Sequence, residues 1–359
     1  MMKKPVLSVR DLSVAFGFVK GKKGSFVPRD GETPLQVTDQ VSFDIDAGEF
    51  FALVGESGCG KSVTAMSVLR LLPQPSAQIV NGEVLFYDAQ ETSAGKTECV
   101  NLAKLSLTEL QKYRGSRIAC IFQEPMQALN PVLSIKKQLL EVFSAKPGFK
   151  KEQREQALGT IREQLRQAGF SDPDRVLESY PHELSGGMLQ RVCIVMALLS
   201  KPRLIIADEP TTALDVTVQA QVLAVLKEMA KNTGTAVLLI THNMGIVSQY
   251  ADRVSVMYAG RIVESGPVFE VINGPLHPYT QGLLAAIPES HSEMKNLKSI
   301  PGSVPHPRDF ASGCRFADRC EECSCGSREL QDQCRSLTPP PSINKEMHSV
   351  CCYRALKAH

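Results

Sequence analysis

Eight consecutive residues could bind the phosphates of a nucleotide. They fit the pattern G-x-x-x-x-G-K-[ST] and read Gly55-Glu56-Ser57-Gly58-Cys59-Gly60-Lys61-Ser62. Glycines at this spacing let the backbone wrap around an anion with its N–H groups pointing inward. Lys61 can reach the β- and γ-phosphates, and the Ser62 hydroxyl can ligate Mg²⁺. The chemistry indicated is the binding of a nucleoside triphosphate together with a magnesium ion, with contacts from Gly55, Ser57, Gly58, Gly60, Lys61 and Ser62.

Two adjacent carboxylates later in the chain could act on that triphosphate. The run 204–207 is apolar, as a buried strand would be, and it ends in Asp208 and Glu209 before Pro210 stops the strand. One carboxylate is needed there to hold Mg²⁺ through its water shell, and a second to orient and polarise the attacking water. We therefore predict that Asp208 serves the magnesium ion and that Glu209 activates the water.

A third motif lies between these two, at residues 183–191. Ser185 predicts the N-cap of the helix that follows, and the backbone at Gly186 and Gly187 is open to an approaching anion. This nonapeptide resembles the signature motif of the ATP-binding cassette family. The resemblance implies that Ser185, Gly186 and Gly187 contact the γ-phosphate bound by a partner subunit. ATP would then be sandwiched between two cassettes in a head-to-tail arrangement.

Four further residues match the cassette family in order and spacing. Phe16 resembles the aromatic residue that stacks on adenine. Gln123 resembles the loop glutamine that senses the γ-phosphate and Mg²⁺ and contacts the membrane subunit. His242 resembles the switch histidine that hydrogen-bonds the γ-phosphate, and Asp215 resembles a residue of the loop that crosses the dimer interface. The resemblance implies that Glu209, His242 and Gln123 form a complete hydrolytic set.

The elements that must position these residues follow an α/β pattern over residues 1–288. We expect strands at 6–16, 41–46, 50–54, 82–86 and 236–241 and helices at 151–169 and 216–231. The resemblance implies a P-loop ATP-binding cassette with a RecA-like core, an antiparallel β subdomain and a helical subdomain. The segment 19–32, rich in lysine and glycine, predicts a solvated polar loop. We expect the cassette domain at 1–288 and a small Cys-rich C-terminal extension at 289–359.

Composition and charge favour a protein that works inside the cell without spanning the membrane. Forty basic residues against 38 acidic ones leave a net charge of +2, which gives no reason to expect a nucleic-acid surface. Apolar runs such as 192–199 are far shorter than the roughly 18 residues that a membrane-spanning helix needs. Arg10 and Asp11 interrupt the N-terminal apolar stretch before it could act as a signal peptide. We expect a cytoplasmic chain that meets the membrane through partners.

The last 71 residues differ in kind, because seven of the 11 cysteines lie between Cys314 and Cys352. In the reducing cytosol, clustered cysteines more often bind metal than form disulfides. A zinc ribbon would carry two C-x₂-C pairs, and this segment has one, at Cys320 and Cys323. The zinc interpretation is weakened but stays open.

The tail also indicates which group of cassette proteins the chain resembles. Segments 287–288, 300–305 and 313–320, together with 122–126, 129–131 and 277–280, resemble ATPase subunits of dipeptide, oligopeptide and nickel importers. In that family the extension can hold a four-iron four-sulfur (4Fe-4S) cluster. The resemblance implies four ligands, which are Cys314, Cys320, Cys334 and Cys352. The extra cysteines leave the ligand set open, since Cys351 could replace Cys352, and Cys323 or Cys325 could replace Cys334.

The function implied by the resemblance is that of an ATP-hydrolysing, energy-coupling subunit of an importer for di- or oligopeptides. The implied partners are a second, paralogous ATPase subunit, two transmembrane permease subunits and an extracytoplasmic solute-binding protein. The chain would then lie on the cytoplasmic face of the inner membrane. Nickel or another small solute is the alternative cargo. A soluble, non-transport cassette ATPase is the alternative class, although such proteins usually carry two cassettes or a long coiled coil. A P-loop kinase would leave the signature motif unexplained.

Overall fold

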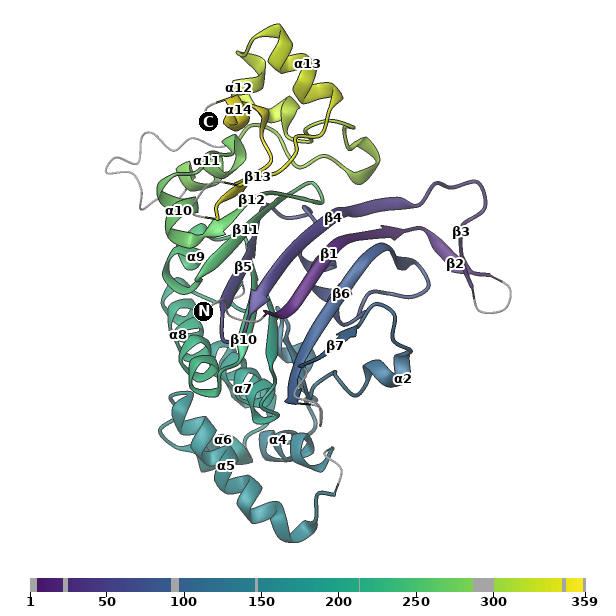
Figure 1. The fold of residues 1–359 in the computed structure, drawn as a ribbon. Helices are drawn as coiled ribbons and strands as arrows, with labels where there is room; N and C mark the ends of the chain where they lie inside the picture. The colour runs from purple at the N-terminus through teal and green to yellow at the C-terminus, as the bar shows by residue number, and fades with distance from the viewer. Residues whose placement is uncertain are drawn as a thin grey trace.

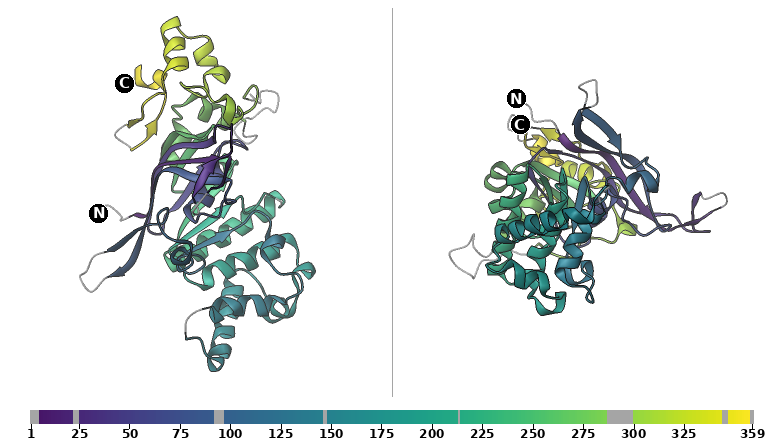
Figure 2. Two further views of the ribbon diagram at one scale, coloured as in Figure 1. Left: turned by 90° about the vertical axis from the view of Figure 1, so that its right-hand side faces the viewer. Right: turned by 90° about the horizontal axis from the view of Figure 1, so that it is seen from below.

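The computed structural model describes residues 5–21, 25–91, 97–145, 148–212, 214–286, 300–343 and 347–357. Figure 1 shows a central sheet, an antiparallel sheet beside it, a group of helices at one end and the C-terminal tail at the other. The left view of Figure 2 also places the helical group and the tail at opposite ends. Within the described ranges, no helix is both long enough and apolar enough to cross a bilayer.

The central sheet has eight strands in the order β13-β14-β12-β11-β5-β10-β9-β8. Five neighbours, from β11 to β8, run parallel, and β12, β14 and β13 add antiparallel strands at one edge. The strands β5 and β10 are buried along their whole length, as parallel strands covered on both faces must be. The parallel strands are β5 (Phe50–Val54), β8 (Ile118–Ile121), β9 (Leu204–Asp208), β10 (Ala236–Thr241) and β11 (Arg253–Tyr258), and β12 spans Arg261–Pro267.

Alternate residues of these strands enter two different hydrophobic cores. Leu204 and Ile206 pack on the side of the antiparallel sheet, together with α1, whereas Ile205 and Ala207 pack on the side of α7 and α8. This alternation follows from the period of two residues in a strand. The covering helices are α1 (Lys61–Val68), α7 (Gly186–Leu199), α8 (Val216–Thr233), α9 (Met244–Tyr250), α10 (Val268–Asn273) and α11 (Pro278–Ala285).

The antiparallel sheet has the strand order β4-β1-β6-β7. Its strands are β1 (Pro5–Phe16), β4 (Leu35–Asp46), β6 (Ala77–Glu91) and β7 (Thr97–Asn101), and the short α2 (Leu107–Leu110) follows them. The sequence predicted a polar loop at 19–32, whereas the described part of this segment contains strand residues. There β2 (Phe18–Lys20) and β3 (Phe26–Pro28) pair as an antiparallel hairpin. The pairing of Val19 with Val27 explains the difference, because apolar residues on facing strands support each other.

The helical group lies between β8 and α7 in the sequence. It consists of α3 (Pro125–Ala128), α4 (Ile135–Ser144), α5 (Arg154–Gln167) and α6 (Pro173–Glu178). The apolar face predicted for 151–169 is confirmed, since Leu158, Ile161 and Leu165 are buried in the core shared with α7. The α/β cassette with a helical subdomain is therefore the observed fold.

The tail packs onto the cassette. It contains α12 (Glu321–Ser324), α13 (Arg328–Ser336), β13 (Ser342–Ile343), β14 (Ser349–Val350) and α14 (Tyr353–Lys357). The strand β14 pairs with β12 and so extends the central sheet. Cys320, Cys323 and Cys334 share one core with Tyr258 and Tyr279 of the cassette side. The boundary predicted at residue 288 lies outside the described residues.

Candidate functional site

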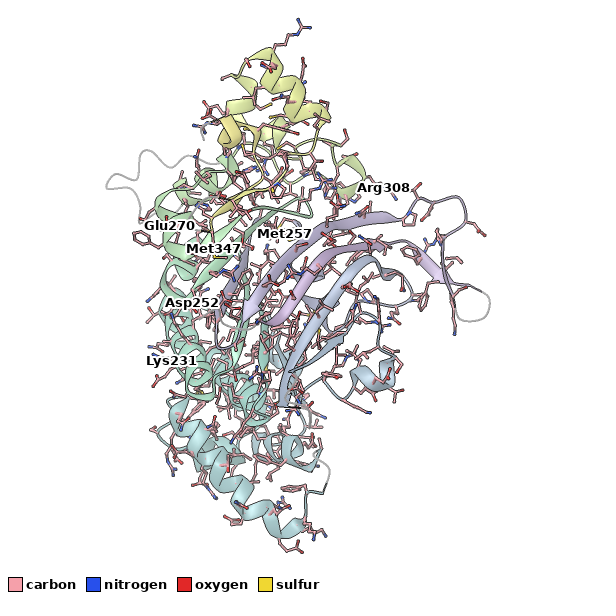
Figure 3. All side chains as sticks on the ribbon, viewed as in Figure 1. Lys231, Asp252, Met257, Glu270, Arg308 and Met347 are labelled. Atoms are coloured by element: carbon pink, nitrogen blue, oxygen red, sulfur yellow. The ribbon has the colours of Figure 1, made fainter. Side chains whose placement is uncertain are left out.

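The phosphate loop follows β5 directly and leads into α1, which begins at Lys61. The strand, loop and helix predicted from the sequence are thus confirmed. Gly55 has a φ of 153° and Gly60 a φ of 104°, conformations that favour glycine. A Cβ at Gly55 would collide with the carbonyl oxygen of Met257. Met257 lies at the end of the sheet that faces the tail (Figure 3), so this is also where the loop lies.

Lys61 is buried and turns its ammonium group into the loop. Its Nζ donates to the carbonyl oxygens of Gly55 at 2.7 Å and Glu56 at 3.0 Å. Ser57 and Gly58 are exposed at the crest of the same loop. An anion bound at the crest would find exposed backbone N–H groups and a lysine cation that is already in place. This arrangement can bind a triphosphate.

Ser62 and Asp208 come together although they are far apart in the sequence. The Ser62 hydroxyl donates to Oδ1 of Asp208 at 2.9 Å. Burial raises the pKa of the Asp208 carboxyl, and the charge of Glu209 raises it further, whereas Ser62 and Lys61 lower it. Oxygen donors of this kind, a hydroxyl beside a carboxylate, are the ligands that Mg²⁺ prefers. The pair can therefore hold a magnesium ion.

Glu209 and His242 also meet, at the ends of the neighbouring strands β9 and β10. Oε1 of Glu209 lies 3.3 Å from Nδ1 of His242, and Oε2 accepts a hydrogen bond from the Thr212 hydroxyl at 2.8 Å. The backbone of Glu209 has a φ of 46°, and its N–H donates to the carbonyl of Ile240 at 3.0 Å. The side chain is 16% exposed. The carboxylate is thus held in one orientation and still reaches water.

Gln123 and Phe16 reach the same region from two further elements. Gln123 follows the end of β8, and β8 runs parallel to β9 with Ile121 opposite Ala207. Gln123 is therefore exposed at the sheet edge that carries Asp208. Phe16 is the last residue of β1. Val14 of the same strand pairs with Thr38, and Thr38 packs beside Gly60 of the phosphate loop, so the end of β1 lies near this loop.

The signature motif begins α7. Ser185 is the N-cap residue, and its side chain accepts a hydrogen bond from the N–H of Met188 at 3.4 Å. Ser185 and Gly186 are exposed, whereas Gly187 is buried against Val218. Asp215 caps α8 by accepting from the N–H of Val218 at 3.0 Å. The signature motif and the Asp215 loop therefore pack together, and their exposed side is free within the single chain.

The predicted cysteine ligands are gathered in the tail, but the described residues contain no group of three or more His, Cys, Asp or Glu side chains arranged to hold a metal ion. The pKa of Cys314 is raised to about 12. Burial is the main cause, and the charges of Cys352, Cys320 and Cys323 also contribute. The pKa of Cys334 is also raised to about 12, first by burial and second by the charges of Cys323 and Cys314. The structure thus adds Cys323 to the predicted four thiols.

The two remaining alternatives are placed differently. Cys325 is exposed. Cys351 is half-buried, and its N–H donates to the carbonyl of Val263 at 2.9 Å. Burial raises its pKa to about 11, and Cys352 is the one cysteine that contributes to this shift. Cys352 and Cys323 therefore influence the pKa of other tail thiols, whereas Cys351 is coupled to Cys352 alone and Cys325 is exposed.

Sequence reasoning missed two residues that contact the phosphate loop. Arg319 forms an ion pair with Glu56, and the hydroxyl of Tyr279 accepts a hydrogen bond from the Glu56 N–H at 2.8 Å. Both lie outside every nucleotide motif. The sequence analysis considered Arg319 only as a neighbour of the tail cysteines. Nothing in the sequence indicated that it contacts Glu56.

Comparison with known proteins supports the same assignment. Residues 38–212 match the family described as ABC transporter, and residues 263–325 match the oligopeptide/dipeptide transporter C-terminal region. The oligopeptide transport ATP-binding protein AppD of Bacillus subtilis is 43% identical, over 89% of this chain and 91% of its own. The dipeptide transport ATP-binding protein DppD of the same organism is 41% identical, over 97% of this chain and 94% of its own.

A solved structure shares the fold. It is a dimeric, post-hydrolysis state of an ATP-binding cassette bound to ADP and Pi, and it superimposes with a TM-score of 0.56 at 25% identity, covering 73% of this chain and 98% of that one. The chain belongs to the ATP-binding cassette family of transporter ATPases, in the group that carries the oligopeptide and dipeptide transporter C-terminal region.

Proposed function

We propose that this ATPase is the energy-coupling subunit of a di- or oligopeptide importer and works at the cytoplasmic face of the cell membrane. One observation carries the proposal: a cassette with its hydrolytic residues in place and the peptide-transporter C-terminal region occur together in one chain. Relatives named as oligopeptide and dipeptide transport subunits match it over nearly their whole length. Their names supply the cargo class.

The nucleotide residues take the following roles in this proposal. Lys61 binds the β- and γ-phosphates, while Ser62 and Asp208 hold the magnesium ion. Glu209 accepts the proton of the attacking water, and His242 at 3.3 Å orients this carboxylate and contacts the γ-phosphate. Gln123 joins the magnesium shell, and Phe16 stacks on adenine.

A second ATPase subunit completes the site. The exposed Ser185 and Gly186 begin α7, and a helix N-terminus attracts an anion. The related cassette is a dimer with nucleotide products bound. We infer a head-to-tail dimer in which this end of α7 meets the γ-phosphate on the partner subunit.

A groove beside Gln123 suits the permease. It has a volume of about 810 Å³ and runs along β8, the edge strand of the central sheet. Apolar side chains such as Ile121, Val142 and Met196 line it together with the basic Lys112, Arg114 and Arg117, and the lining residue Phe122 is 43% exposed. A cytoplasmic segment of a permease seated here would touch the residue next to Gln123. Closure around ATP would then move the permease through the same contact.

Co-expression with the permease subunits tests the proposal. The complex, supplied with its solute-binding protein in lipid vesicles, should hydrolyse ATP several-fold faster when a dipeptide or oligopeptide is added. Ala128→Arg, at an exposed position of the groove, should abolish co-purification with the permease because the long side chain would fill the space that the permease segment needs. The matched variant Ala224→Arg, on an exposed part of α8, should leave it intact. Stimulation by nickel and not by peptides would overturn the cargo assignment.

We propose further that the thiol group of the tail holds a 4Fe-4S cluster. The donor chemistry fits, because the half-buried Cys314 and the buried Cys320, Cys334 and Cys352 supply four sulfurs, and the backbone N–H of Cys323 donates to Sγ of Cys320 at 3.4 Å. When bound, the cluster would supply cross-links that a short, loop-rich segment otherwise lacks.

Anaerobic purification tests this part of the proposal. The protein should be brown and contain about four iron atoms per chain. Cys314→Ser should remove both the colour and the iron, whereas Cys325→Ser, at an exposed cysteine, should retain them. Colourless protein with one zinc ion would replace the cluster by a zinc site, and metal-free protein with an ordered tail would refute both.

A further inference from the structure

The phosphate loop is held from outside the cassette motifs, at Glu56. The Arg319 guanidinium makes two hydrogen bonds to the Glu56 carboxylate, Nη1 to Oε2 at 2.8 Å and Nη2 to Oε1 at 3.0 Å. The Tyr279 hydroxyl accepts from the Glu56 N–H at 2.8 Å. Both partners lie within residues 263–325, the part that matches the peptide-transporter C-terminal region. Two bonds between a planar guanidinium and a carboxylate fix orientation as well as charge.

Arg319 is itself rigidly held. Its Nε donates to the carbonyl of Pro301 at 2.7 Å, and its Nη2 to the carbonyl of Gly302 at 3.2 Å. The guanidinium lies near the rings of Tyr258 and Phe316, 5.6 and 5.9 Å from their centroids. The side chain is only 8% exposed. A cation fixed in this way meets Glu56 with little loss of conformational entropy and little competition from water.

The charge of Glu56 matters because of its place in the loop. Its carbonyl oxygen accepts a hydrogen bond from Lys61 Nζ at 3.0 Å, so the residue adjoins the phosphate-binding cation. A carboxylate without a partner at this position would repel a triphosphate. It would also be free to draw the loop into other conformations. Arg319 neutralises the carboxylate and fixes its orientation through two hydrogen bonds.

We infer that Arg319 is a positioning residue for ATP binding: acting through Glu56, the C-terminal tail neutralises and orients the phosphate loop. This inference rests on the proposed role of that loop in binding ATP. It assigns to the tail a part in the nucleotide site that the cassette motifs do not contain. The ATP affinity of the chain then depends on the docking of its tail.

A double-mutant cycle on the full chain tests the inference, with the dissociation constant for ATP measured by titration calorimetry. Arg319→Gln should weaken ATP binding about tenfold, because it leaves a carboxylate charge beside the triphosphate. In the Glu56→Gln background the same Arg319→Gln change should alter the constant less than about twofold, since the charge has gone. Arg319→Lys, which keeps the charge but not the two-pronged geometry, should fall between.

The matched control is Arg315→Gln. Arg315 also ties the tail to the cassette, but its carboxylate partner is Asp39, at 2.7 Å, which keeps its ion pair with Arg261 in the variant. ATP affinity should therefore stay within about twofold of the original. Equal weakening by Arg315→Gln, or by Arg319→Gln in both backgrounds, would reduce Arg319 to a structural role. If Arg319→Gln does not fold, the Arg319→Lys cycle decides. Undiminished ATP affinity in Lys61→Ala would refute the proposed nucleotide site itself.

Discussion

Glu209→Gln should slow ATP hydrolysis by about 10² to 10⁴-fold, the usual contribution of a general base. Glutamine keeps the shape of the side chain and can still meet the Thr212 hydroxyl, which lies at 2.8 Å, but it cannot accept a proton from water. ATP affinity should change little, because in our proposal Lys61 and the loop backbone bind the phosphates. The variant should accumulate a closed dimer with ATP bound. Single-turnover hydrolysis and gel filtration with ATP measure the two effects.

Two comparison variants make this result interpretable. Lys61→Ala should lose ATP affinity itself, because it removes the cation at the phosphates. Glu228→Gln, the same change on an exposed part of α8, should leave both hydrolysis and binding unaltered. Hydrolysis by Glu209→Gln at close to the original rate would show that another group activates the water.

His348→Ala should destabilise the C-terminal region by about 1–3 kcal/mol, the range for leaving a buried hydrogen-bonding group without its partner. Nε2 of His348 lies 2.6 Å from Oε1 of Glu264, and the two side chains are 3% and 0% exposed. Glu264 also accepts from the N–H groups of Leu276 and His277, at 2.7 and 2.9 Å. These contacts join β12, the start of α11 and β14. Urea denaturation of the full chain, followed by tail-specific proteolysis, measures the loss.

An exposed ion pair of the same tail provides the control. Arg354 and Glu322 lie 3.1 Å apart with side chains 44% and 47% exposed. Water already solvates both groups, so Arg354→Ala should cost less than about 1 kcal/mol. Similar urea denaturation midpoints for His348→Ala and Arg354→Ala would mean that the buried pair of His348 and Glu264 does not fix β14 on the sheet.

The nucleotide site could be predicted because its residues occur at strand ends. An apolar run that stops at a glycine, at Asp208 or just before His242 shows where a buried strand meets the loop edge. Parallel strands then bring these ends together without any further information. The contact between Glu209 and His242 follows from the adjacency of β9 and β10.

The contacts of the tail could not be predicted in this way. Its strands β13 and β14 have two residues each, too few to show an alternating pattern, although they complete one edge of the sheet. The pairing of Arg319 with Glu56 depends on how the tail packs, and one arginine among many has no local signal. The sequence offered Cys323 as an alternative ligand, and its place beside Cys320 depends on the turn that α12 makes.

The separation of Glu56 and Arg319 has a consequence for biosynthesis. They are 263 residues apart, and at roughly 5–20 residues per second a ribosome needs about 13–50 s to add that length. During this interval the nascent cassette carries a phosphate loop whose Glu56 has no arginine partner. By our inference such a chain binds ATP poorly until its tail has docked. Fragments released early would therefore be weak competitors for ATP.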